Sequence, residues 1–93
     1  MATTIERLTA PLRDAIDVLQ QRARTHGDYL EVHIRTAALW SAYLQVEVTP
    51  RQVAQCMALL KLARDELAPR HNPDNLVDQA GYIAIAEALR DVS

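Results

Sequence analysis

The sequence has few of the residues that build sheets, disulfide frameworks or aromatic cores. It contains no Phe, one Trp and three Tyr, so its core must consist mainly of aliphatic side chains. Only two glycines occur, and the sequence has no two alternating β-branched runs separated by a short turn, so β-hairpins are disfavoured. The single cysteine, Cys56, excludes an intrachain disulfide and a cysteine-based metal cluster. We interpret it as a small buried thiol.

Charge and hydropathy narrow the classes of function. The formal net charge of −2 and the pI of about 5.8 argue against a protein that coats nucleic acid in bulk. No apolar run approaches the length of a membrane span, and the N-terminal "MATTIERL" lacks the apolar core of a signal peptide. We therefore expect a soluble, cytoplasmic protein. Residues 1–93 suit a single helical domain, and so short a chain buries a modest fraction of its surface, which favours a homo-oligomer.

Apolar residues that recur every three or four positions predict an all-α fold. Short connections between such segments favour antiparallel neighbours, hence a compact four-helix bundle with helices over about 10–26, 28–45, 50–68 and 73–91. The first helix is predicted to begin near Ala10, because Pro11 is best tolerated in a first turn. Gly27 is expected to end it, and Asp28 to cap the second helix with the help of Glu31.

Two later helix starts are marked by a cap followed by a proline. Thr49, Pro50 and Gln52 form the pattern of a capping box, and Asn72 precedes Pro73 in the same way. In the fourth helix Gly81 costs stability relative to alanine. It therefore indicates close contact with another helix or with a ligand.

Charged residues lie on the apolar faces of the third and fourth helices. A step of seven residues returns to nearly the same direction on a helix, so Arg64 points with Met57, and Asp78 with Ile85. Because a lone buried charge is costly, we predict that Arg64 and Asp78 meet across the two helices. Such a pair can equally be structural, fixing helix register and nothing more.

Further polar residues extend this predicted seam. Lys61 lies at the edge of the apolar stripe of the third helix, and His33 flanks that of the second. The turn with Arg24, Thr25, His26 and Asp28 offers side chains to an anion, although Asp28 is first of all a helix cap. The two histidines make no metal-binding pattern, so surface or hydrogen-bonded polar positions are the better interpretation of each taken alone.

The order of several segments resembles a family of small phage and prophage proteins of unknown function. These segments are "THGDY", "AALWSAYL", "VTPRQVAQCMALLKLAR" and "NPDNLVDQAGYIAIAEAL". More distantly, "K..R" followed by "D...D.AGY" resembles nucleotide-modification-associated phage domains and the MazG-like all-α nucleotide pyrophosphohydrolases. The MazG-like enzymes hold magnesium with two acidic helical motifs. By this resemblance the earlier motif falls on Lys61 and Arg64, and the later one on Asn75 and Asp78.

Three hypotheses of function follow. The leading one is a protein that binds a nucleotide or another phosphorylated ligand without turnover and without a cofactor, and thereby sequesters a host defence signal in the host cytoplasm. Its predicted ligand-binding residues are Arg24, Thr25, His26, Asp28, His33, Lys61, Arg64 and Asp78, with no catalytic residue or metal ligand. The alternatives are a Mg²⁺-dependent pyrophosphohydrolase using Asp28, Glu31, Asp74 and Asp78, and an inhibitor that docks on a host protein.

Overall fold

The computed structural model describes residues 1–92, except the side chain of His26, and this part of the chain contains helices and no strand. The helices are α1 (Thr4–His26), α2 (Tyr29–Leu44), α3 (Pro50–Leu67) and α4 (Pro73–Ala88). The predicted all-α four-helix bundle is therefore confirmed. The predicted bounds of α2, α3 and α4 lie within three residues of those observed, and the start of α1 differs more.

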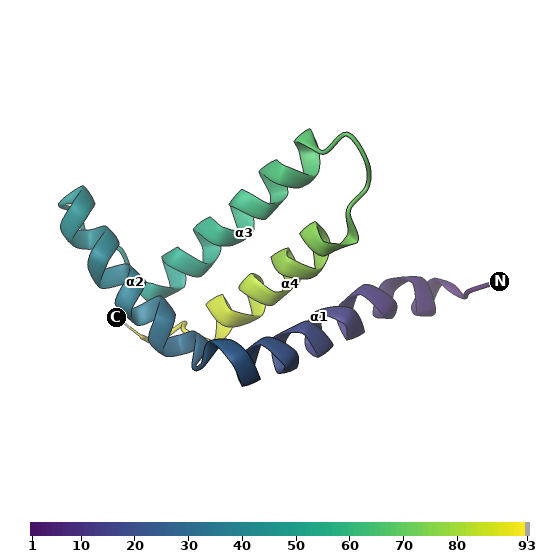
Figure 1. Cartoon of the computed structure of the whole chain (residues 1–93), viewed down its shortest axis with the longest axis horizontal. Helices are drawn as coiled ribbons and strands as arrows, with labels where there is room; N and C mark the ends of the chain where they lie inside the picture. The colour runs from purple at the N-terminus through teal and green to yellow at the C-terminus, as the bar shows by residue number, and fades with distance from the viewer. Residues whose placement is uncertain (93) are drawn as a thin grey trace.

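The centre of the fold is the hairpin of α3 and α4, whose two helices make the most extensive contact in the molecule. Helix α1 packs along α4, while α2 crosses the N-terminal part of α3 (Figure 1). The core is small and aliphatic, as the composition predicted. It consists of Ala54, Ile85, Ala86 and Leu89, with Leu19, Tyr29, Tyr82 and Val92 packed against it.

Helix α1 begins six residues before the predicted start. Thr3 caps it, since its hydroxyl accepts a hydrogen bond from the Glu6 amide at 3.1 Å. Pro11 therefore lies inside the helix and not in its first turn. The missing amide leaves only the Arg7 carbonyl without its helical donor, and this cost is small where water can hydrate the carbonyl. A start near Ala10 was therefore the wrong prediction.

The predicted helix caps are largely confirmed. Asp28 Oδ1 accepts a hydrogen bond from the Leu30 amide at 2.8 Å. The Glu31 side chain does not accept one from the Asp28 amide in return, so the predicted capping box is only half formed. Thr49 and Gln52 form the complete capping box at the start of α3. Asn72 caps α4, since its Oδ1 accepts a hydrogen bond from the Asp74 amide at 3.0 Å. These local signals fix the helix starts independently of the tertiary packing.

Two features of the surface bear on function. In the described part of the chain, no helix combines the length and the apolarity needed to cross a membrane. Cys56 is exposed, so the prediction of a buried thiol is wrong. The reason is that α3 is covered on one face only, by α2 and α4, and Cys56 lies outside that face.

Candidate functional site

The most unusual charge in the structure is the buried carboxylate of Asp78, in α4. Asp78 Oδ1 lies 3.2 Å from an Arg22 guanidinium nitrogen in α1, and its Oδ2 lies 3.1 Å from Lys61 Nζ in α3. The side chain of Asp78 is 8% exposed, that of Lys61 17% and that of Arg22 45%. A carboxylate this deeply buried is retained only when partners of opposite charge compensate it. The cluster joins three helices and carries two positive charges against one negative.

The predicted pairing of Arg64 with Asp78 is wrong. Lys61, one turn before Arg64, takes the place beside Asp78, and the Arg64 side chain is exposed. The direction of Arg64 around the helix was estimated from the period, but its position along the axis was not. One helical turn moves a side chain about 5.4 Å along the axis, which is enough to carry Arg64 past its expected partner.

Aromatic rings line an open hollow beside this cluster. Tyr29, Val32, His33 and Tyr82 form its walls together with Arg22. The ring centroids of His33 and Tyr82 lie 6.1 Å apart, with planes inclined by 57°. His33 is buried, and its Nδ1 lies 2.7 Å from the Tyr29 carbonyl oxygen. Because a carbonyl can only accept, Nδ1 carries the hydrogen in this contact, and Nε2 is left for another partner.

The hollow has a volume of about 250 Å³, and its lining residues Arg22, Tyr29 and Tyr82 also line a much smaller cavity. That inner cavity, of about 30 Å³, lies between α1 and α4 beside Asp78 and Gly81. It has room for about one water molecule. Small-molecule pockets usually begin at about 300 Å³. The open hollow comes close to this volume and can take a phosphate with part of a ring system, whereas the inner cavity is too small for a ligand of this kind.

Burial also affects Tyr29, whose hydroxyl donates to the Leu19 carbonyl at 3.1 Å. Removal from water raises the pKa of the Tyr29 phenol above its ordinary value of 10.0. The positive charge of Arg22 opposes this increase, and nearby Tyr82 adds to it. The Tyr29 hydroxyl is therefore a neutral hydrogen-bonding group at the edge of the hollow throughout the physiological range of pH.

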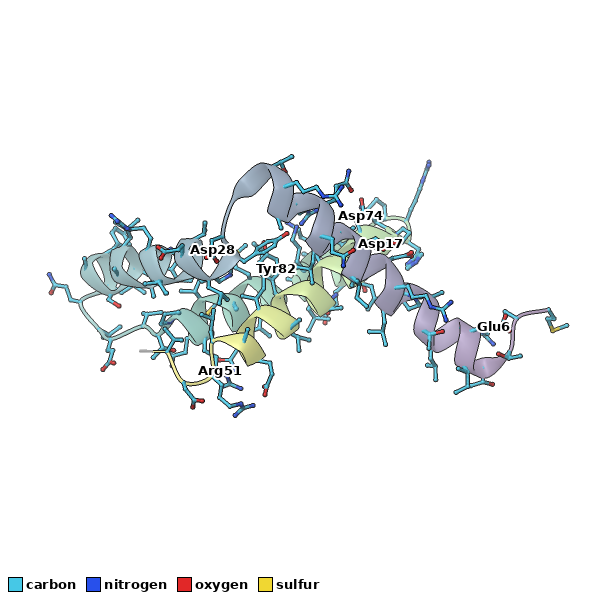
Figure 2. All side chains as sticks on the ribbon, turned by 90° about the horizontal axis from the view of Figure 1, so that it is seen from below. Glu6, Asp17, Asp28, Arg51, Asp74 and Tyr82 are labelled. Atoms are coloured by element: carbon cyan, nitrogen blue, oxygen red, sulfur yellow. The ribbon has the colours of Figure 1, made fainter. Side chains whose placement is uncertain are left out.

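The structure brings together some of the predicted site residues and separates others. His33 lines the hollow, while Lys61 and Asp78 belong to the charged cluster beside it. Arg24 and Thr25 are exposed near the end of α1, where the Thr25 hydroxyl donates to the Arg22 carbonyl. Asp28 is likewise exposed and serves as the cap of α2, and Figure 2 labels it at the start of that helix. The side chain of His26 lies outside the described residues.

Sequence reasoning missed Arg22 and the wall formed by Tyr82. Arg22 follows the buried Ala15 by seven residues, so the period of α1 placed it on the packed face. That signal was available from the sequence. Tyr82 is half-buried against the core, while its remaining surface lines the hollow.

The acidic residues considered for magnesium do not assemble into one site. Among the side chains that the structure describes, no group of three His, Cys, Asp or Glu residues is placed to hold a metal ion. Asp78, the acid carried over from the MazG-like motif, has both oxygens engaged by cations. Mg²⁺ requires several oxygen ligands in octahedral geometry, and this donor set does not fit it.

Comparison with known proteins identifies the family. The model of the "Domain of unknown function (DUF6378)" matches residues 11–90. The chain belongs to this family. The DUF6378 match covers all of α2, α3 and α4 and most of α1, and therefore includes every residue of the Asp78 cluster and of the hollow.

A phage protein is similar to this DUF6378 domain. The Gene 55 protein of Mycobacterium phage L5 is 45% identical over 71 residues, which are 75% of this chain and 45% of the phage protein. The chain thus spans less than half the length of that relative. The resemblance to a phage family of unknown function is confirmed, and the chain is a phage-like protein. No solved structure matches it.

Proposed function

We propose that the DUF6378 domain binds a small phosphorylated ligand, of the nucleotide class, in the hollow lined by Arg22, His33 and Tyr82. The observation that carries this proposal is the composition of the Asp78 cluster. Two cations surround one carboxylate, so the cluster has an excess positive charge, and one of its cations, Arg22, also lines the hollow. Asp78 compensates one of the two positive charges, and a bound anion would compensate the other.

The side chain of Arg22 is the most suitable group for direct contact. It lines the hollow, is about half exposed and uses one terminal nitrogen for Asp78, so further guanidinium N–H groups remain for phosphate oxygens. Asp78 holds the guanidinium in place in the absence of a ligand, which reduces the entropy lost on binding. Tyr29 and Tyr82 supply flat apolar surfaces on which a base can stack.

Calorimetric titration with inorganic phosphate and with nucleoside mono-, di- and triphosphates tests the proposal. We expect binding of at least one nucleotide, and a loss of about tenfold or more in affinity for Arg22→Gln. The matched control is Arg24→Gln, an exposed arginine two residues away that should bind like the wild type. Absence of binding throughout the panel, or equal losses in the two variants, would contradict the proposal.

The fate of the ligand separates binding from hydrolysis. Under the proposal, a nucleotide incubated with the protein and Mg²⁺ is recovered intact after heat denaturation. Release of pyrophosphate or monophosphate would instead support the MazG-like alternative. That alternative needs a bound metal ion, and among the described residues the side chains around Asp78 supply too few oxygen ligands for one. If the bound nucleotide is a host defence signal, stoichiometric binding lowers its free concentration, and this gives sequestration without any chemical step.

A further inference from the structure

The N-terminal half of α1 leaves the bundle and has an uncovered apolar face. This segment, residues 4–16, is called the arm, and in Figure 1 it extends away from the hairpin of α3 and α4. Its exposed aliphatic side chains follow the helical period and are Ile5, Leu8, Leu12 and Ile16. The Cα radius of gyration of 14.8 Å exceeds the roughly 12 Å expected of a compact chain of this length.

A second uncovered apolar surface lies between α3 and α4. This groove has a volume of about 660 Å³ and is formed by residues of α3 and α4 and by Arg90, which follows α4; of these only Ala86 belongs to the core cluster. Leu59 and Leu62 of α3 and Ile83 of α4 project from it, and all three are exposed. The arm continues α1, whose second half packs on another face of α4, and in Figure 1 it points away from the hairpin, so it does not cover the groove of its own chain.

The two surfaces agree in length. From Ile5 to Ile16 the arm rises by eleven residues, which is about 16 Å along a helix. The groove extends from Arg51 to Leu62 on α3, again eleven residues. An amphipathic helix that lays its apolar face into a groove of matching length is a recurrent mode of recognition.

The arm carries acidic side chains, and the border of the groove is positively charged. The groove is bordered by Arg51, Glu87 and Arg90, and is therefore positive by one charge. Glu87 is hydrogen-bonded to Arg90, whereas Arg51 Nε is buried with no hydrogen-bond partner among the described residues. Within the arm two acidic side chains, Glu6 and Asp14, are balanced by two basic ones, and Asp17 follows directly after it, so carboxylates are available along its length. A carboxylate from a docked arm is a suitable acceptor for the guanidinium of Arg51.

We propose that the protein is a reciprocal dimer, in which the arm of each copy occupies the α3–α4 groove of the other. Two such contacts related by a twofold axis cover both apolar surfaces of both chains. Pairing of one arm with the other arm would leave both grooves uncovered.

Sedimentation velocity over a series of concentrations tests the proposal with three single substitutions. Leu8→Asp places a charge on the arm, and Ile83→Asp places one in the groove, at side chains that are 60% and 62% exposed within the chain. We expect the wild type to be a dimer and both variants to dissociate at least about tenfold more readily. Leu39→Asp, at a 62% exposed leucine of α2, is the matched control and should remain a dimer. Circular dichroism verifies that each variant is folded.

Mixing the two dissociating variants identifies the mode of contact. The Ile83→Asp copy has an intact arm and the Leu8→Asp copy an intact groove, so one arm–groove contact is restored and a mixed dimer should form. If Leu8→Asp alone dissociates the dimer, the arms pair with one another and the proposal is wrong. A wild type that is monomeric over the whole series, or a control that dissociates like the variants, overturns it as well.

Discussion

At the scale of single residues, Asp78 determines how three helices meet. Each of its carboxylate oxygens contacts a cation from a different helix, so one side chain fixes α1 and α3 relative to α4. Such compensation makes the buried charge tolerable, but it also makes the cluster sensitive to the loss of its one acidic member.

The substitution Asp78→Asn leaves Lys61 and Arg22 without their counter-charge. Because Arg22 can turn into water and the Lys61 side chain is mostly buried, we expect the free energy of unfolding to decrease by about 1–3 kcal/mol. Urea denaturation measures this change. Asp17→Asn, at an exposed aspartate of α1, is the control and should stay within about 0.5 kcal/mol of the wild type. Equal effects of the two substitutions would show that the cluster contributes nothing specific.

Tyr29 gives the stability a dependence on alkaline pH. Its pKa is raised in the folded state by burial, so the folded protein retains the phenol proton to higher pH than the unfolded chain. The corresponding stability is fully present below pH 10 and is lost as the pH rises through the folded-state pKa. Tyr29→Phe should cost about 0.5–1.5 kcal/mol near neutral pH, through the lost hydrogen bond to Leu19, and should flatten this alkaline loss. Denaturation at pH 8 and above compares the two slopes.

At the scale of elements, the sequence was most informative about where helices begin. Thr49 with Gln52, and Asn72 with Pro73, act through hydrogen bonds within a few residues, and such local chemistry is readable from the chain alone. Contacts between helices were less predictable. The period indicated that Asp78 faces inward, but whether Lys61 or Arg64 lies opposite depends on the axial register of α3 against α4, which no local signal specifies.

The turn between α1 and α2 depends on the backbone freedom of Gly27. This residue has φ +78° and ψ −152°, a region that is almost closed to residues with a Cβ atom. Gly27→Ala should therefore decrease the free energy of unfolding by about 1–3 kcal/mol, measured by denaturation, although no neighbouring atom lies within 4 Å of the added methyl group.

Gly81→Ala is the natural counterpart of that substitution. Gly81 has ordinary helical geometry, and an added Cβ would meet Leu19 Cδ2 at 3.5 Å, which is a normal packing distance. The helix propensity of alanine then favours an increase in stability of up to about 1 kcal/mol. A loss as large as that of Gly27→Ala would show that α1 and α4 tolerate no further volume between them.

At the scale of the whole molecule, the uncovered apolar faces link stability to association. If each arm is bound by a second copy, the folded dimer is favoured by mass action, and the thermal midpoint should rise with protein concentration. Leu12→Asp, in the exposed stripe of the arm, should remove this dependence and lower the midpoint toward that of the dilute wild type. A midpoint that is independent of concentration for the wild type would contradict the prediction.

Pro11 sets a boundary within α1 that becomes important in this context. Without an amide hydrogen it cannot bond to the Arg7 carbonyl, so the turns before it are joined to the rest of the helix by a weakened ladder. A helix of so few residues is marginal when nothing covers it. Amide deuterium uptake in residues 4–10 should therefore be fast in dilute samples and slow once two copies associate. The exchange rate of these first turns would then report the extent of self-association.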